Sequence, residues 1–181
     1  MKLHIGGKEK HQDWKILDIE PRPEVDFVAD AADLRDFPSG CCDAIYASHV
    51  LEHFYHGIGG EVIKVLKEWH RVLKPGGTIY LSVPDLDKLC WLYTRPDVTL
   101  QEKLHIMSII YGGQSNIYDV HKVGFDYQIM GYYLATAGFI EVQRVERFNF
   151  FNDCSNYCIR GELISLNVMA SKKQGWGIEY V

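Results

Sequence analysis

The chain contains 181 residues, of which 47% are hydrophobic and 24% are charged. This size and composition are typical of one globular domain with a single core, and they exclude an intrinsically disordered protein. The 19 basic and 24 acidic side chains give a net charge of -5, and the basic residues form no stripe that could follow a phosphate backbone. Nucleic acid is therefore not an expected partner.

The N-terminal segment and the cysteines indicate the compartment. The first residues, MKLHIGGKEK, lack the apolar region of a secretory signal, and the longest apolar runs have the length of strands. The five cysteines include no CxxC pair, which favours free thiols over a disulfide framework. Cys154 and Cys158 leave a metal or redox pair as a minor alternative. We therefore expect a cytoplasmic protein that does not contact a membrane.

Short apolar runs rich in β-branched residues predict the strands. In chain order they cover residues 2–5, 14–19, 25–29, 43–47, 78–83, 139–146 and 162–170. Helical periodicity runs from Gly60 to Leu73, and the following Lys-Pro-Gly ends it. A second helix is predicted from the N-cap Asp126 to the breaker Gly138.

This order of elements predicts an α/β fold. We expect a doubly wound, mostly parallel sheet with one antiparallel strand near its edge, in a single domain over residues 1–181. Residues 86–125 lack strand alternation, and we expect them to form an insertion that covers the site. Small ligands of such sheets lie beyond the carboxyl ends of the strands.

The residues that follow the first three predicted strands fit an adenosine-containing ligand. Gly6 and Gly7 allow a tight turn and a close approach of the ligand to the backbone. Asp18 can accept hydrogen bonds from both hydroxyls of a ribose, and Asp30 can accept from an adenine amine. An alternative for Asp30 and Asp33 is that each caps the chain after its strand.

Two further segments carry a family resemblance. The segment CDAIYASHVLEHF and the later RVLKPGGTIYLSVPD are similar to the class I S-adenosylmethionine-dependent methyltransferases, which have a Rossmann-like fold. The resemblance covers about residues 2–85 and continues more weakly through HKVGFDYQIMGYYLATAGFIEV. It implies S-adenosylmethionine as the cofactor and a small-molecule or sugar-containing methyl acceptor as the partner. A protein of the same fold that binds the cofactor without catalysis is the alternative, and a homodimer is left open.

The resemblance also implies roles for individual residues. Gly6 and Gly7 would contact the methionine part of the cofactor and Asp18 the ribose. Ser48 would lie near the sulfonium. The adenine would be bound by Asp30 and Ala31, with Asp33 and Leu34 as near alternatives.

The first loop departs from the family pattern. Lys8 stands where a second spaced glycine is expected, and about ten residues separate Gly7 from Asp18, too few for a helix with its turns. The first crossover is therefore expected to be a short loop. One wall of the cofactor pocket must then be thin or be supplied by the insertion. The missing helix also argues against an NAD site.

The segment from His49 to His53 matches the pattern H-x-x-E-H of one class of zinc proteases. We expect no metal here, because the segment opens the helix that follows the fourth strand and the sequence identifies no third ligand. Glu52 and the two histidines are expected to cap or border the cleft.

The acceptor side is assigned to the end of the insertion. The segment from Tyr118 to Lys122 precedes the closing helix and can reach over the ends of the fourth and fifth strands. We expect His121 to line the acceptor pocket as a general base or an orienting donor, with Tyr118 beside it.

Overall fold

The computed structural model describes residues 1–175 and contains a seven-stranded sheet in the order β3-β2-β1-β4-β5-β9-β6. The strands are β1 (Lys2–Ile5), β2 (Trp14–Asp18), β3 (Phe27–Val28), β4 (Cys42–Ser48), β5 (Leu73–Pro84), β6 (Phe139–Val145) and β9 (Ser165–Lys172). Strands β3, β2, β1, β4 and β5 pair in parallel, whereas β9 is antiparallel to both β5 and β6. The predicted fold class, with one antiparallel strand near the edge, is confirmed.

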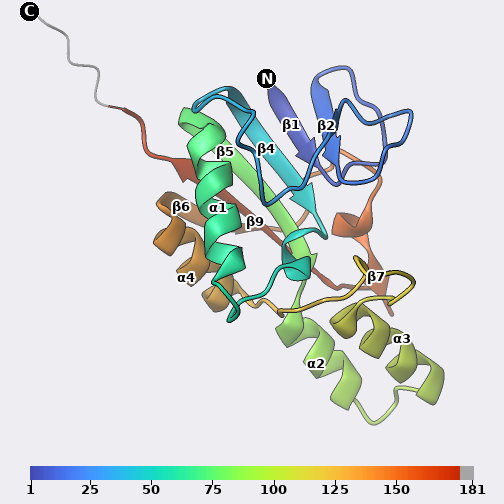
Figure 1. Ribbon diagram of the computed structural model, residues 1–181. Helices are drawn as coiled ribbons and strands as arrows, with labels where there is room; N and C mark the ends of the chain where they lie inside the picture. The colour runs from blue at the N-terminus through green and yellow to red at the C-terminus, as the bar shows by residue number, and fades with distance from the viewer. Residues whose placement is uncertain (176–181) are drawn as a thin grey trace, which may run out of the picture.

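Two helices cover one face of the sheet. Helix α1 (Glu61–Val72) and helix α4 (Tyr127–Ala137) lie side by side in front of the strands in Figure 1. Their buried side chains, including Trp69 and Leu134, pack with Ile45 and Leu81 in the main core. Both helices agree with the predicted spans to within two residues.

The ends of these helices use polar groups that the sequence places there. The carboxylate of Asp126 accepts a hydrogen bond from the backbone N–H of Ile129 at 2.7 Å, as an N-cap does. At the end of α1, Lys172 Nζ donates to the carbonyl oxygens of His70 and Leu73, each at 2.7 Å. A cation from β9 therefore satisfies carbonyl groups that the last helical turn leaves free.

The opposite face of the sheet is covered by aromatic side chains instead of helices. Successive residues of a strand face opposite sides, so Tyr46 lies on this face while Ile45 belongs to the main core. Tyr46 packs with Trp14 and with Phe151, a residue of the segment between β6 and β9. This segment supplies the wall that a helix in the first crossover would have formed.

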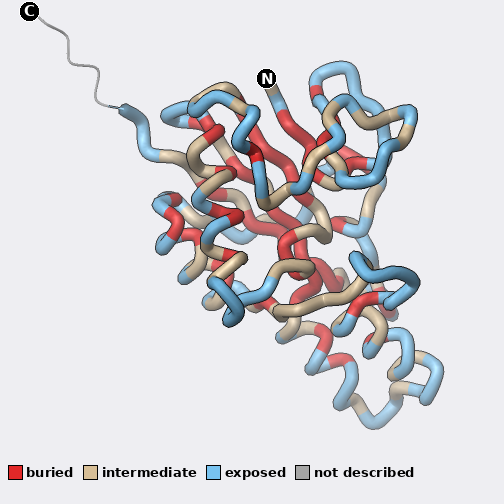
Figure 2. The backbone as a smooth tube through the Cα atoms, in the orientation of Figure 1, coloured by how far each residue is buried: buried red, intermediate tan, exposed pale blue. Residues whose placement is uncertain are grey.

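Residues 86–125 contain two helices, α2 (Leu86–Thr94) and α3 (Leu100–Tyr111). They project from the end of β5 and have a small core of their own, which includes Leu92 and Ile106. In Figure 2 the exposed positions of this unit lie around its tip, and its buried positions lie toward the rest of the molecule. Ile159 of β7 (Cys158–Ile159), which pairs with β8 (Glu162–Leu163), completes the small core. No helix within residues 1–175 is long and apolar enough to cross a membrane.

The chain after β4 differs from the expectation. A helix was expected to open there, but the structure has a single 3-10 turn, η1 (Leu51–His53), and α1 begins after Gly60. Gly60 has a φ of 62°, which a glycine adopts without strain. The predicted strand over residues 162–170 is interrupted at Ile164 and divided into β8 and β9, and the predicted strand over residues 25–29 is reduced to β3.

His4 on β1 leads to a prediction about acid stability. Its ring is 3% exposed and packs against Phe151 with ring centroids 4.1 Å apart, and burial lowers the pKa of His4 from 6.5 to about 4. The folded state therefore disfavours the protonated ring. The stability that this group contributes is complete above pH 6.5 and is lost as the pH falls toward 4, by roughly 3 kcal/mol. We expect His4→Phe to reduce the loss of unfolding free energy between pH 7 and pH 4.5, measured by urea denaturation. An unchanged pH dependence would contradict this account.

Candidate functional site

The predicted cofactor residues lie in a row at one edge of the sheet. Ile5 at the end of β1 pairs with Leu17 of β2 and with Ala47 of β4. The next residue of each strand or turn is Gly6, Asp18 or Ser48, so these three residues are neighbours across the sheet. Asp18 in turn pairs with Val28 of β3, two residues before Asp30. The parallel register thus brings together residues that are far apart in the sequence (Figure 1).

The Gly6-Gly7 turn is tightly packed. Gly6 has a φ of 73°, and a Cβ atom at this position would lie 2.6 Å from Cγ2 of Val50. A Cβ atom at Gly7 would lie 2.7 Å from Nδ1 of His4. Glycine is therefore required here by the packing of the protein itself, in addition to any contact with a ligand.

Both carboxylate oxygens of Asp18 already accept hydrogen bonds. Oδ1 accepts from the backbone N–H of Glu20 at 2.9 Å, and Oδ2 accepts from Nη2 of Arg22 at 2.9 Å. The same Nη2 atom donates to the carbonyl oxygen of Gly7 at 2.8 Å. Hydrogen bonding to Asp18 raises the pKa of Arg22, so the guanidinium stays charged. Each carboxylate oxygen can accept more than one hydrogen bond, and a ribose would have to share Asp18 with Arg22.

The turn after β3 contains Asp30 and Ala31. Oδ1 of Asp30 accepts from the backbone N–H of Ala32 at 2.8 Å, so the carboxylate caps the turn, as the alternative interpretation of this residue expects. The carbonyl oxygen of Ala31 accepts from Nε1 of Trp69 at 2.8 Å, which ties the turn to α1. Asp30 is exposed, and its turn is held in place by the contact with Trp69.

Ser48 ends β4 with its hydroxyl unused. The Oγ atom is buried and has no hydrogen-bond partner within residues 1–175. Buried hydroxyls are normally paired, and an unpaired one lowers stability. A polar group of a ligand at the end of β4 would satisfy this atom. This observation fits the role that the family resemblance implies for Ser48, because the methionine part of the cofactor carries charged amino and carboxyl groups.

A cluster of titratable side chains follows Ser48 directly. Glu52 in η1 is 1% exposed, and neither of its carboxylate oxygens has a hydrogen-bond partner among residues 1–175. Oε1 lies 3.5 Å from Nδ1 of His49 and 3.9 Å from Nε2 of His121. The ring of His53 stands edge-on to the ring of His121, with centroids 4.8 Å apart.

Two backbone contacts hold His121 beside η1. The N–H of Lys122 donates to the carbonyl oxygen of Glu52 at 2.8 Å, and Nδ1 of His53 donates to the carbonyl oxygen of Val120 at 3.2 Å. The segment after α3 therefore passes next to the end of β4, as Figure 1 shows.

Burial dominates the electrostatics of the cluster. It raises the pKa of Glu52 to about 8 and lowers the pKa of His49 to about 4. It also lowers the pKa of His53 and of His121, and the mutual repulsion of these two rings lowers the pKa of His121 further. Near neutral pH the three rings are uncharged, and a carboxylic acid is retained at Glu52.

The two residues that the sequence assigns to the acceptor differ in how far they are buried. The side chain of His121 is 9% exposed and belongs to the cluster. Tyr118 lies in the loop after α3, and its residue is 55% exposed. The placement of Tyr118 beside His121 stays a prediction.

Two participants were not identified as such from the sequence. Arg22 belongs to no sequence motif. Its contacts with both Gly7 and Asp18 arise because the fold brings these two residues close together. Glu52 was noted as part of H-x-x-E-H, but its partner His121 lies 69 positions away and no local pattern joins them. The unpaired state of Glu52 could be found only from the structure.

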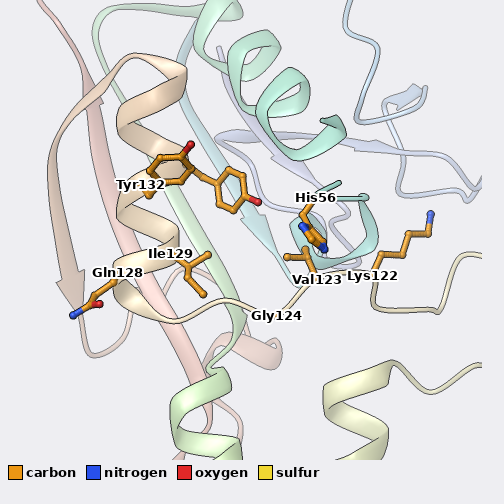
Figure 3. A pocket seen from close by; sticks show the side chains of 8 residues that line it. His56, Lys122, Val123, Gly124, Gln128, Ile129 and Tyr132 are labelled. Atoms are coloured by element: carbon orange, nitrogen blue, oxygen red, sulfur yellow. The ribbon is translucent and has the colours of Figure 1, made fainter. Parts of the chain in front are cut away.

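A surface groove of about 630 Å³ lies near this region (Figure 3). Tyr132 and Tyr133 of α4 form one side, and Lys122 and His56 form the other. Its lining residues include none of those predicted for the cofactor. We therefore do not assign the cofactor to this groove.

The strand order defines the fold. A sheet of parallel strands that continues with an antiparallel strand between β5 and β6 is the class I methyltransferase fold. The comparison with family models agrees. Residues 8–81 match the model described as a methyltransferase domain, and the resemblance to class I S-adenosylmethionine-dependent methyltransferases is confirmed.

Solved structures share this fold at low sequence identity. A methyltransferase from Archaeoglobus fulgidus is 17% identical, with a TM-score of 0.57 over 94% of this chain and 85% of that chain. Burkholderia thailandensis 1,6-didemethyltoxoflavin-N1-methyltransferase, with its substrate and S-adenosylhomocysteine bound, is 17% identical, with a TM-score of 0.57 over 96% and 71%. Human N-acetylserotonin methyltransferase in complex with S-adenosylmethionine is 16% identical, with a TM-score of 0.51 over 89% and 41%.

The relation to these proteins is one of fold. The chain spans less than half of the human protein and between about seven and nine tenths of the other two. No curated protein sequence matches the chain.

The Gly6-Gly7 turn gives a prediction about stability. We expect Gly6→Ala to lower the free energy of unfolding by about 2–4 kcal/mol, because the residue must adopt a positive φ and its Cβ overlaps Val50. Adding Val50→Ala removes the overlap but keeps the backbone strain, so the double variant should lose less than the sum of the single variants. Urea denaturation of the four proteins measures this coupling. Strict additivity would show that Val50 does not enforce the glycine.

Proposed function

We propose that this protein transfers a methyl group from S-adenosylmethionine to a small-molecule or sugar-containing acceptor. The observation that carries the proposal is the row of Gly6, Asp18, Asp30 and Ser48 at the carboxyl ends of four neighbouring strands, with an unpaired Ser48 hydroxyl at one end. The row offers acceptors for ribose and adenine on one side. On the other side it offers a polar atom for the amino acid part of the cofactor.

The cofactor would supply a methyl group activated by its sulfonium. The residues of this chain would then act mainly by position, since methyl transfer is an in-line displacement and alignment of the reacting groups can contribute up to about 7–11 kcal/mol. Asp18 would hold the ribose, and Asp30 with Ala31 the adenine. Gly6 and Gly7 would let the methionine part approach the backbone of the first turn.

The acceptor would meet the cofactor near the end of β4. His121 is held at this place by the Lys122 to Glu52 hydrogen bond, and its side chain is nearly enclosed. We propose that His121 orients the acceptor or receives its proton, with Tyr118 closing from the loop. Residues 86–125 would act as the insertion that covers this side. The Burkholderia relative binds a small molecule, which supports a small-molecule acceptor.

A second candidate function is cofactor binding without catalysis. It is favoured by Arg22, which occupies an oxygen of Asp18 and the carbonyl of Gly7 at the same time. Lys8, which stands where the family pattern has a glycine, also favours this second candidate. A cytoplasmic location, with no nucleic acid or membrane as partner, belongs to both proposals.

Binding measurements test the cofactor site. We expect S-adenosylhomocysteine and S-adenosylmethionine to bind, and Asp18→Ala to weaken both at least tenfold. The variant loses two charge-assisted hydrogen bonds to the ribose, each worth about 1.5–3 kcal/mol. Arg22→Ala is the matched control, since it removes the ion pair but keeps the carboxylate, and its affinity should equal or exceed that of the wild type. Isothermal titration calorimetry gives the constants, and an unchanged value for Asp18→Ala would remove Asp18 from the site.

Turnover measurements test the acceptor side. Metabolite pools are first screened for uptake of label from S-adenosylmethionine. With the acceptor found, His121→Ala and His121→Gln should lower the turnover number about 10²–10⁴-fold at saturating cofactor, whereas cofactor affinity stays intact. His105→Ala is the control, because His105 is an exposed residue of α3. Turnover within twofold of the wild type for both His121 variants would contradict the assignment. Cofactor binding without turnover on any acceptor would favour the second candidate.

A further inference from the structure

Three side chains with metal-binding atoms converge behind the end of β4. One ligand atom each of Glu52, His53 and His121 lies within 4.8 Å of the other two. We propose that these residues form a binding site for a divalent transition-metal ion of the zinc type. None of the three residues is among those proposed to contact the cofactor. Metal binding by this site does not require methyl transfer.

The state of Glu52 is the first argument. Its carboxyl group is 1% exposed, and neither oxygen has a hydrogen-bond partner within the described residues. Burying such a group without a partner is costly, and native proteins rarely retain one without a compensating charge or ion. The side chains that face it, from His49 just before η1 and from His121 after α3, are imidazoles, and no Lys or Arg within residues 1–175 is paired with it. A cation between the carboxylate and the rings would compensate the burial.

The orientation of His53 is the second argument. A backbone carbonyl can only accept, so the contact with Val120 fixes the proton of the neutral ring on Nδ1. The lone pair of Nε2 is then free for an ion. Histidines that bind metals almost always donate their other ring nitrogen to a carbonyl or carboxylate in this way.

The donor set indicates the kind of ion. Two imidazoles and one carboxylate suit zinc and related first-row ions better than magnesium or calcium, which prefer oxygen ligands. A tetrahedral zinc ion with bonds of about 2.1 Å needs ligand atoms about 3.4 Å apart. Oε1 of Glu52 and Nε2 of His121 are 3.9 Å apart, so small side-chain rotations bring them into range.

His49 is a neighbour of the site and not one of its ligands. Its Nε2 is hydrogen-bonded with Oγ of Ser165 at 3.0 Å, and its Nδ1 faces Glu52 at 3.5 Å. His49 can therefore orient the carboxylate of Glu52 without binding the ion. Three protein ligands leave one position of a tetrahedral ion open, which is the arrangement of ions that bind a substrate atom.

This inference reverses the expectation that His49 and His53 bind no metal. The sequence pairs these two residues in H-x-x-E-H and offers no third ligand. The fold instead directs His49 to Ser165 and brings His121 from the segment after α3. If the proposed methyl transfer holds, an ion here would act on the acceptor, and His121 would act through the ion.

Zinc binding to the purified protein tests the site. Protein made without a metal-affinity tag is stripped with a chelator, titrated with zinc chloride and passed through a desalting column. We expect one zinc per chain for the wild type, and dissociation constants raised about 100-fold or more in His53→Ala and His121→Ala. His56→Ala is the matched control, since His56 is an exposed histidine three residues from His53. It should bind zinc as the wild type does.

Glu52→Gln separates a ligand from a structural residue. Gln keeps the shape of Glu52 but cannot ionise to a carboxylate ligand, so the metal-free variant should be at least as stable as the wild type. We expect zinc to raise the melting temperature of the wild type and of His56→Ala, and to have little effect on Glu52→Gln. Cobalt substitution should give the visible absorption of a tetrahedral site in the wild type but not in Glu52→Gln. Failure of the wild type to retain zinc, or equal loss in His56→Ala and His53→Ala, would overturn the proposal. Neither result depends on methyl transfer.

Discussion

The parallel pairing of β1 with both β2 and β4 is the constraint on which the rest of the structure depends. Because Ile5 is in register with Leu17 and Ala47, the three strands end at the same level. The chain must leave each strand at this edge, so Gly6, Asp18 and Ser48 meet there. A slip of one residue would turn every side chain to the other face and separate these groups. The core side chains of β1 and β4 therefore fix the positions of these three residues as well as the fold.

The short first crossover changes how this sheet is covered. With no helix between β1 and β2, the face that carries His4 and Tyr46 needs another cover. The segment between β6 and β9 provides it with phenylalanine side chains, and Asp153 of the same segment accepts a hydrogen bond from the Tyr46 hydroxyl at 2.7 Å. This face of the sheet is thus covered by the C-terminal part of the chain, whereas the helices of residues 86–125 pack on each other around a separate small core.

The cluster of titratable side chains that follows Ser48 is an unfavourable arrangement for stability and offers several groups that could take part in chemistry. An unpaired buried carboxyl group and three uncharged imidazoles are an unfavourable way to fill a protein interior. Such arrangements persist where the polar groups have a use, and perturbed titratable groups gather at functional sites. In this chain the cluster lies one turn after a residue assigned to the cofactor, and it is tied to the segment that leads from α3 to α4. Both the proposed methyl transfer and the proposed metal site involve residues of this cluster.

The sequence by itself determined the sheet, both flanking helices and the residues after each strand. Periodicity and capping are local, so the strand over 2–5, the helix over 60–73 and the Asp126 cap could be assigned without knowledge of the rest of the chain. The segment from His49 to His53 is expected to open the helix after the fourth strand, but it forms the turn η1, and the helix begins after Gly60, where the periodicity predicts it.

Only the tertiary structure decided which distant groups share a space. Arg22 bridges Gly7 and Asp18, Phe151 covers Tyr46, and His121 reaches Glu52, and each contact joins segments that no repeat or motif relates. Burial and hydrogen-bond partners are properties of the packed chain, because they depend on all the elements that surround a group. The sequence could therefore name candidate residues, but the packing determined which of them lie together.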